Sequence, residues 1–161
     1  MGSSLYHIVY LSAASHRLGD DELRAILSTS RSNNRERGIT GMLLYSDGAF
    51  IQALEGHEPE VKALYNTIER DPRHGRIITL LDGPIDARNF PQWEMGFQHV
   101  DADNPDLPGF SRFFDEPDPH EDLRRILPRP IKLLLSFKQS STARPRESAP
   151  CYRSGPGTKL V

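Results

Sequence analysis

The chain has 161 residues, of which 37% are hydrophobic and 26% charged, a composition typical of one globular domain with a single core. Its net charge of −2 excludes the broad basic surface that attracts nucleic acid, so no nucleic-acid partner is expected. The lone cysteine, Cys151, cannot close an intrachain disulfide, and no apolar run is long enough to span a membrane, so we expect a cytoplasmic protein without a membrane partner.

The first two predicted elements are a strand and a helix. Residues 5–12 are rich in β-branched and aromatic side chains, which is typical of a strand, and Tyr10 shares one face with other apolar residues. In residues 20–32, apolar side chains recur at helical spacing behind an acidic start, and a glycine follows the expected end. Asn33 and Asn34 are therefore expected at the C-terminus of this helix.

A hairpin follows the helix. Two apolar segments, residues 39–45 and 49–55, are joined around Ser-Asp-Gly, which predicts a pair of antiparallel strands. In the second strand, Gln52 points to the same face as Phe50 and Leu54, which places an amide on an apolar face. A buried amide without partners costs roughly 1–3 kcal/mol. Gln52 is therefore expected to bind either protein groups or the polar edge of a ligand.

One more helix and two more strands complete the pattern. Pro59 suits the first turn of a helix that an Asp-Pro pair ends, and residues 77–81 predict a fourth strand. Trp93, Met95 and Phe97 alternate with Glu, Gly and Gln in a fifth strand. The predicted order of elements is therefore β-α-β-β-α-β-β.

This order predicts an α+β, ferredoxin-like fold with a mixed five-stranded sheet and both helices on one face. The other face needs a cover, and residues 123–135 offer a C-terminal helical segment interrupted by prolines. We expect a folded domain over residues 5–100 and a helical extension over residues 101–137. Residues 138–161 are dominated by Ser, Pro, Arg and Gly and are expected to form a disordered tail.

Motifs of the common enzyme classes are missing from the sequence. It contains no Gly-x-Gly-x-x-Gly, phosphate-binding loop, His-Glu-x-x-His, Cys-x-x-Cys or Gly-x-Ser-x-Gly. None of the six histidines has an obvious metal-ligand spacing to another. We therefore expect neither a metal site nor a catalytic site.

Three polar side chains allow both a structural and a ligand-binding interpretation. Tyr10 suits the core by its ring, but its buried hydroxyl needs a partner. Asn33 and Asn34 suit a helix cap and a turn, and their amides also match the alternating carbonyl and N–H edge of a flavin pyrimidine ring. These residues alone leave both interpretations open.

Five separated motifs resemble those of the BLUF family, the sensors of blue light using FAD. In chain order they are IVYLS at 8–12, SRSNNRERGITGMLLYS at 30–46, GAFIQALEG at 48–56, DPRH at 71–74 and RNFPQWEMGF at 88–97. The resemblance covers residues from about 5 to 100. It implies a blue-light photoreceptor that binds oxidised FAD non-covalently, with FMN or riboflavin as alternatives.

The resemblance implies that four positions are photoactive. Tyr10 matches the light-active tyrosine, and Gln52 matches the glutamine between that tyrosine and the flavin. Trp93 and Met95 match two fifth-strand positions whose side chains exchange places near the glutamine.

Cofactor binding is implied for Gln52 and for five further positions. Asn34 matches the asparagine that holds the edge of the flavin ring, and Asn33 lies beside it. Arg73 and His74 match residues that flank the cofactor, and Ser30 matches a small polar residue near it.

The mechanism implied by the resemblance is a switch. Transient electron and proton transfer from Tyr10 leaves the Gln52 amide rotated or tautomerised, and a hydrogen bond to the flavin becomes stronger. Such a domain is not an enzyme, and it passes its signal to an unidentified effector protein or through a change of homo-oligomer. The alternatives are a flavin-free interaction module of the same fold, or a small hydrolase or flavin reductase on the same scaffold.

Overall fold

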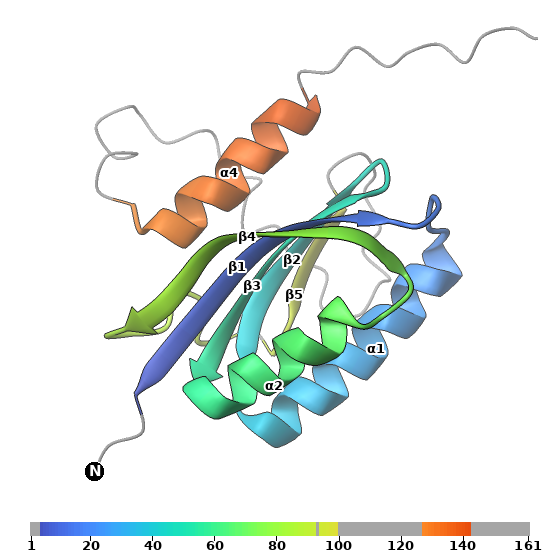
Figure 1. Ribbon diagram of the computed structural model, residues 1–161. Helices are drawn as coiled ribbons and strands as arrows, with labels where there is room; N and C mark the ends of the chain where they lie inside the picture. The colour runs from blue at the N-terminus through green and yellow to red at the C-terminus, as the bar shows by residue number, and fades with distance from the viewer. Residues whose placement is uncertain (1–3, 93, 100–126, 143–161) are drawn as a thin grey trace, which may run out of the picture.

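The computed structural model describes residues 4–92, 94–99 and 127–142. It contains one five-stranded sheet with helices on both of its faces (Figure 1). The strands are β1 (Leu5–Ala14), β2 (Thr40–Ser46), β3 (Ala49–His57), β4 (His74–Ile85) and β5 (Gly96–His99). The helices are α1 (Asp20–Arg37), α2 (Glu58–Glu69) and α4 (Arg129–Thr142).

The sheet has the strand order β4-β1-β3-β2-β5 and is mixed. The pairs β1–β4, β1–β3 and β2–β3 are antiparallel, whereas β5 runs parallel to β2. The predicted α+β, ferredoxin-like order of elements and the mixed five-stranded sheet are therefore confirmed.

The turn between β2 and β3 sets the register at the centre of the sheet. Asp47 and Gly48 both have positive φ, 44° and 81°, as a tight two-residue hairpin turn requires. The resulting register places Gln52 between Tyr10 of β1 and Leu43 of β2. The hairpin signal thus fixes which side chains meet in the middle of the sheet.

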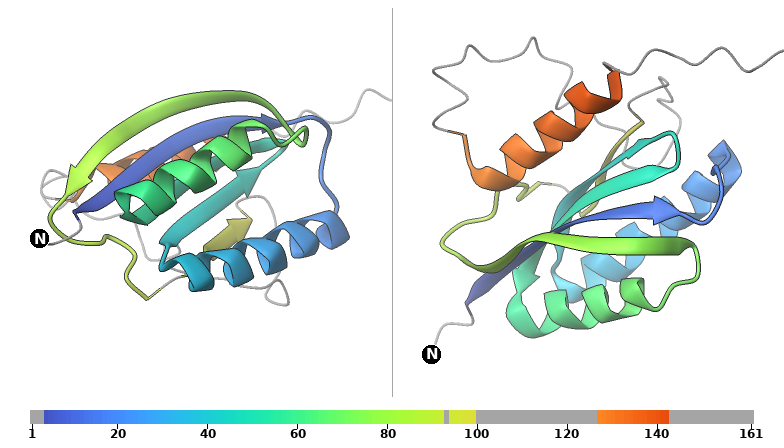
Figure 2. Two further views of the ribbon diagram at one scale, coloured as in Figure 1. Left: turned by 60° about the horizontal axis from the view of Figure 1, so that its bottom comes forward. Right: turned by 45° about the horizontal axis from the view of Figure 1, so that its top comes forward.

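Two apolar cores lie on opposite faces of the sheet. Alternating residues of β1 and β3, such as Tyr10 and Leu54, pack with Leu23 of α1 and Val61 of α2. The other face packs against α4 around Leu134. Figures 1 and 2 show α1 and α2 together on one side and α4 on the other, as the sequence predicts.

Helix α1 is longer than the sequence predicts, so the expectation that Asn33 and Asn34 end it is wrong. The helix continues to Arg37, and Gly38 ends it in the left-handed conformation with φ of 65°. Asn34 is tolerated inside the helix because its amide group bonds to a distant segment, and its backbone carbonyl accepts from the Ile39 amide at 2.9 Å.

The C-terminal elements also differ from expectation at their ends. Strand β5 begins at Gly96, so Met95 precedes the strand, and Trp93 lies outside the described residues. Helix α4 begins at Arg129, and a proline is its second residue. Proline is tolerated in the first helical turn, because a backbone N–H there has no partner within the helix. It continues to Thr142, past the expected boundary at residue 137. Residues 123–126 and 143–161 lie outside the described residues.

Candidate functional site

A cavity of about 160 Å³ lies between α1 and α2 and ends on the sheet. Side chains of Leu43, Phe50 and Gln52 form its floor on β2 and β3. The walls include apolar side chains of both helices, such as Ile26 and Leu64. A concave site that combines apolar side chains with several converging polar groups is typical of a site for a small ligand.

The structure brings the predicted cofactor-binding residues together around this cavity. The ones that line it are Ser30, Asn33, Asn34, Gln52, Arg73 and His74. They come from α1, from β3, from the segment that joins α2 to β4 and from the first residue of β4. The fold therefore brings together residues that are far apart in the sequence.

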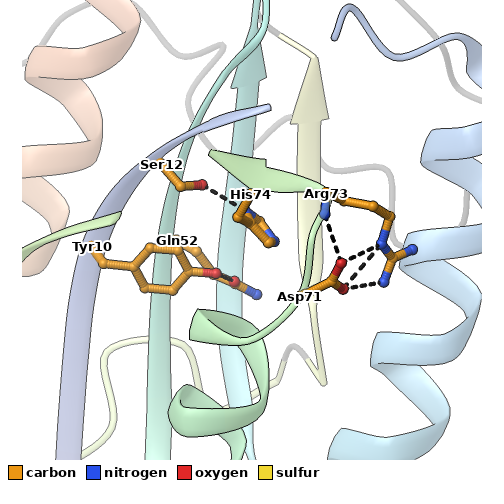
Figure 3. Close-up of polar contacts among 6 residues, drawn as sticks. All are labelled: Tyr10, Ser12, Gln52, Asp71, Arg73 and His74. Atoms are coloured by element: carbon orange, nitrogen blue, oxygen red, sulfur yellow. Dashed lines mark hydrogen bonds and ion pairs between the residues drawn. The ribbon is translucent and has the colours of Figure 1, made fainter. Parts of the chain in front are cut away.

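Tyr10 and Gln52 form a buried polar pair beside the cavity floor (Figure 3). Tyr10 is 1% exposed and Gln52 is 6% exposed, and the Tyr10 hydroxyl donates a hydrogen bond to Gln52 Oε1. Burial raises the pKa of Tyr10 far above its ordinary value, so the phenol keeps its proton. The pair therefore presents a neutral donor to a neutral acceptor.

The other end of the Gln52 amide contacts Met95. Gln52 Nε2 donates to Met95 Sδ at 3.3 Å, and Met95 is fully buried. The carbonyl and amino ends of a carboxamide have similar shapes but opposite hydrogen-bonding roles. A change in the Gln52 amide is therefore felt by both Tyr10 and Met95.

Asn34 has one satisfied end and one unsatisfied end. Its Nδ2 donates to the backbone carbonyl of Glu94 at 2.7 Å, whereas its Oδ1 is buried without a hydrogen-bond partner. A buried acceptor without a partner is costly. An N–H group on a ligand in the cavity would satisfy this oxygen, and the N–H flanked by carbonyls on a flavin pyrimidine ring has this chemistry.

His74 lies against the aromatic part of the site. Its Nδ1 is 2.8 Å from Ser12 Oγ, and its ring lies 5.5 Å from that of Phe50 and 6.4 Å from that of Tyr10. Burial lowers the pKa of His74. A neutral imidazole is therefore favoured next to the cavity.

Arg73 brings a positive charge to the edge of the cavity. Its guanidinium bonds both carboxylate oxygens of Asp71 at 2.5–3.0 Å, and its backbone N–H donates to Asp71 at 2.9 Å (Figure 3). These bonds lower the pKa of Asp71 and raise the pKa of Arg73. The pair fixes the direction of the arginine, which is suited to an anionic group such as a phosphate.

Sequence reasoning missed two acidic residues of the site. Asp71 lines the cavity but was assigned only to the end of a helix. An Asp-x-Arg spacing inside the DPRH segment is a signal that could have found its pair with Arg73. Glu94 was treated only as a polar residue of the alternating fifth strand, and no local signal shows that α1 binds it.

The part of the chain that the structure describes offers neither a cluster of metal ligands nor a helix suited to span a membrane. No group of three or more His, Cys, Asp or Glu residues there could hold a metal ion. Among the same residues, no helix is both long and apolar enough to cross a membrane.

The comparisons with known proteins agree on one family. The profile described as "Sensors of blue-light using FAD" matches residues 5–96. Photoactivated adenylate cyclase subunit beta from Euglena longa is 37% identical over 94 residues, which cover 58% of this chain and 11% of that protein. The chain thus spans only about a tenth of that relative.

Solved structures share the fold over most of the chain. The dark-state structure of BlrB, a BLUF protein, has 27% identity and a TM-score of 0.62, and the match covers 89% of this chain and 100% of that one. Klebsiella pneumoniae BlrP1 with FMN and cyclic diGMP has 28% identity and a TM-score of 0.65, over 84% of this chain and 34% of that one.

Proposed function

Because the chain belongs to the BLUF family of blue-light sensors, we propose that it binds oxidised flavin between α1 and α2 and reports light through Tyr10 and Gln52. The observation that carries the proposal is the buried Tyr10–Gln52 hydrogen bond beside the cavity floor. The pair combines an oxidisable phenol with an amide that can exchange donor and acceptor.

Asn34 and Gln52 are proposed to hold the polar edge of the flavin ring. The unpartnered Asn34 Oδ1 supports this, because it needs a donor from the cavity side. Arg73 and His74, with Ser30 and Asn33, are proposed to flank the rest of the cofactor. We propose FAD as the natural cofactor. FMN is the alternative, because the structure of the Klebsiella pneumoniae relative is described with FMN.

When bound and excited by blue light, the flavin supplies a strong one-electron oxidant. Tyr10 is proposed as the electron donor, and its hydrogen bond gives its proton a direct path to Gln52 Oε1. The Gln52 amide rotates or tautomerises while the electron and the proton return to Tyr10, and this changes which end of the amide donates. The contact of Gln52 Nε2 with Met95 Sδ changes with it.

The size of this change suits a switch. One hydrogen bond contributes on the order of 1 kcal/mol, which shifts a two-state equilibrium severalfold. We therefore propose that the domain turns over no substrate and signals to an effector of unknown identity, either a separate protein or a second copy of this chain. A cytoplasmic location is part of the same proposal.

The absorption spectrum in the dark and after blue light tests the proposed function. We expect a yellow protein whose flavin bands shift to the red on illumination and return in the dark. A colourless purified protein that also takes up no added FAD or FMN would contradict flavin binding. A yellow protein without a reversible shift would contradict the switch.

A further inference from the structure

Two amides that line the cavity bind the same two-residue segment, Glu94–Met95. Gln52 Nε2 donates to Met95 Sδ at 3.3 Å, and Asn34 Nδ2 donates to the Glu94 carbonyl at 2.7 Å. Both amides line the cavity. The segment is therefore bonded to two separate residues of the cavity lining.

Helix α1 holds this segment from the outside as well. Arg35 donates from Nε and Nη2 to the two carboxylate oxygens of Glu94, each at 2.9 Å. Arg31 donates to the Met95 carbonyl at 3.1 Å, and its Nη2 lies 3.7 Å from Glu94 Oε2. These bonds lower the pKa of Glu94, so its carboxylate stays charged at neutral pH.

The segment leads directly into the edge of the sheet. Strand β5 begins at Gly96 and pairs with β2, and it is the last strand in the order. Met95 is fully buried, and its Cε would lie 3.4 Å from a Cβ built on Gly41 of β2. Met95 therefore packs against β2 at the point where β5 joins the sheet.

We propose that Arg31, Arg35 and Glu94 form a latch that positions Met95 against Gln52 and sets how readily a change in Gln52 moves β5. The proposal rests on the proposed function, because it makes Glu94 the positioning residue for the signal that leaves the flavin site. It assigns a specific role to three side chains outside the photoactive pair.

The strength of the latch is matched to the signal. Exposed ion pairs are weak, and the side chains of Arg35 and Glu94 are 68% and 33% exposed. A pair of this strength is comparable to one hydrogen bond of Gln52. The latch therefore holds the segment in the dark without preventing its release when the Gln52 amide changes.

Methionine methyl spectroscopy of the full chain, purified with its flavin and kept in the dark, tests the latch directly. The sequence has three methionines, Met1, Met42 and Met95, so a ¹³C-methyl-methionine NMR spectrum shows few signals. The Met95 signal is assigned by its loss in Met95→Leu. Met42 of β2 is the register partner of Gly96, so its signal gives a second report on the junction with β5.

Glu94→Gln and Arg35→Gln are each expected to shift or broaden the Met95 signal. Amides of Met95, Gly96 and Phe97 should exchange with solvent roughly two- to fivefold faster, the range expected for loss of one exposed ion pair. The reciprocal pair Arg35→Glu with Glu94→Arg should restore part of both readouts relative to Glu94→Arg alone, because the attraction to residue 35 returns while Arg31 repels the new arginine.

Glu58→Gln is the matched control, since it removes the exposed Glu58–Lys62 pair on α2 and leaves the latch intact. It should change neither the Met95 signal nor the exchange of the β5 amides. If Glu94→Gln and Arg35→Gln behave like this control, the latch proposal is wrong.

The same proteins separate failure of the latch from failure of the proposed function. The dark methyl signals and the amide exchange require no photochemistry. A wild-type protein without a reversible red shift would contradict the proposed function and leave these readouts interpretable. If the shift is normal, the latch variants should return to the dark spectrum at a rate altered roughly two- to fivefold, which Glu58→Gln should not show. Unaltered recovery in both latch variants would contradict the coupling.

Discussion

Tyr10 of β1 and Gln52 of β3 occupy opposite positions in the register of the sheet, and the Tyr10 hydroxyl donates to Gln52 Oε1 inside the core. The pleat of the sheet points both side chains toward α1 and α2, so they can form this bond where their strands place them. The stability of the fold and the proposed photochemistry therefore depend on the same hydrogen bond.

Tyr10→Phe is expected to bind flavin but lose the light-induced red shift. The ring volume is kept, whereas the hydroxyl that donates to Gln52 is removed. The measurement is the absorption spectrum of the purified variant before and after blue light.

Tyr65→Phe is the matched control for this variant. The Tyr65 ring lies 5.5 Å from that of Tyr10, but its hydroxyl bonds to Thr79 at 2.7 Å and not to Gln52. The control should retain the red shift. A normal, reversible shift in Tyr10→Phe would remove Tyr10 from the proposed mechanism.

Gln52→Leu is expected to bind flavin, to lose the red shift and to be less stable than wild type. Leucine fills similar space but leaves the buried Tyr10 hydroxyl without its acceptor, at a cost of roughly 1–3 kcal/mol in the free energy of unfolding. Urea unfolding and the absorption spectrum measure the two effects separately.

The double variant Tyr10→Phe/Gln52→Leu tests whether that cost comes from the orphaned hydroxyl. Removal of both partners leaves no unsatisfied group at this point, so the double variant should be more stable than Gln52→Leu alone. If the double variant loses as much stability as the two single variants added together, the cost comes from packing instead.

Asn34→Ala should purify with a lower flavin-to-protein ratio than Asn33→Ala. Asn34 is 1% exposed and presents its unpartnered Oδ1, whereas Asn33 lines the cavity from an exposed position. Loss of one buried hydrogen bond costs roughly 1–3 kcal/mol, or about five- to 150-fold in affinity. Equal occupancy in the two variants would show that Asn34 serves only the Glu94 carbonyl.

The sequence predicts the sheet and its two-sided core well because those features follow from local patterns. Alternation in residues 5–12 and 49–55 places Tyr10 and Gln52 on the face that meets α1 and α2. The Asp-Gly turn fixes the register of β3 against β2, which sets Gln52 beside Leu43. The role of the cavity residues could be predicted only from the resemblance to the family. A buried amide by itself fits a structural interpretation equally well.

Other features could not be predicted because distant partners decide them. Asn34 lies inside α1, where asparagine is locally unfavourable, and it bonds to the Glu94 carbonyl 60 positions away. Arg35 likewise finds its carboxylate partner only once β5 lies beside β2. Periodicity contains no information on such contacts.

Thermal stability is expected to fall as the pH drops below about 6.5, and His74 is one cause. Burial lowers its pKa in the folded protein, so the unfolded chain binds the proton more readily. Stability is therefore complete above pH 6.5 and declines as the pH falls through the lower, folded pKa. His7, whose pKa burial also lowers, contributes in the same direction.

The measurement is the unfolding midpoint of wild type and His74→Gln at about pH 7.5 and about pH 5.5, a window that histidine titration dominates. The variant should lose less stability than wild type between the two values. An equal loss in the two proteins would mean that His74 does not contribute.

Glu55→Gln is expected to destabilise the fold by roughly 1–3 kcal/mol, because Glu55 is a fully buried acceptor that faces only donors from residues 89 and 90. Its carboxylate accepts the backbone N–H groups of Asn89 and Phe90 at 2.9 Å and the Asn89 side chain at 2.8 Å. A glutamine replaces one acceptor oxygen by an amino group that points at a donor. The buried Phe90 ring, which packs in the core beneath α4, would lose its anchor to β3.

Urea unfolding measures the effect against Glu58→Gln, an exposed change expected to stay within about 0.5 kcal/mol of wild type. A loss for Glu55→Gln no larger than that of the control would show that another contact holds Asn89 and Phe90 against the sheet.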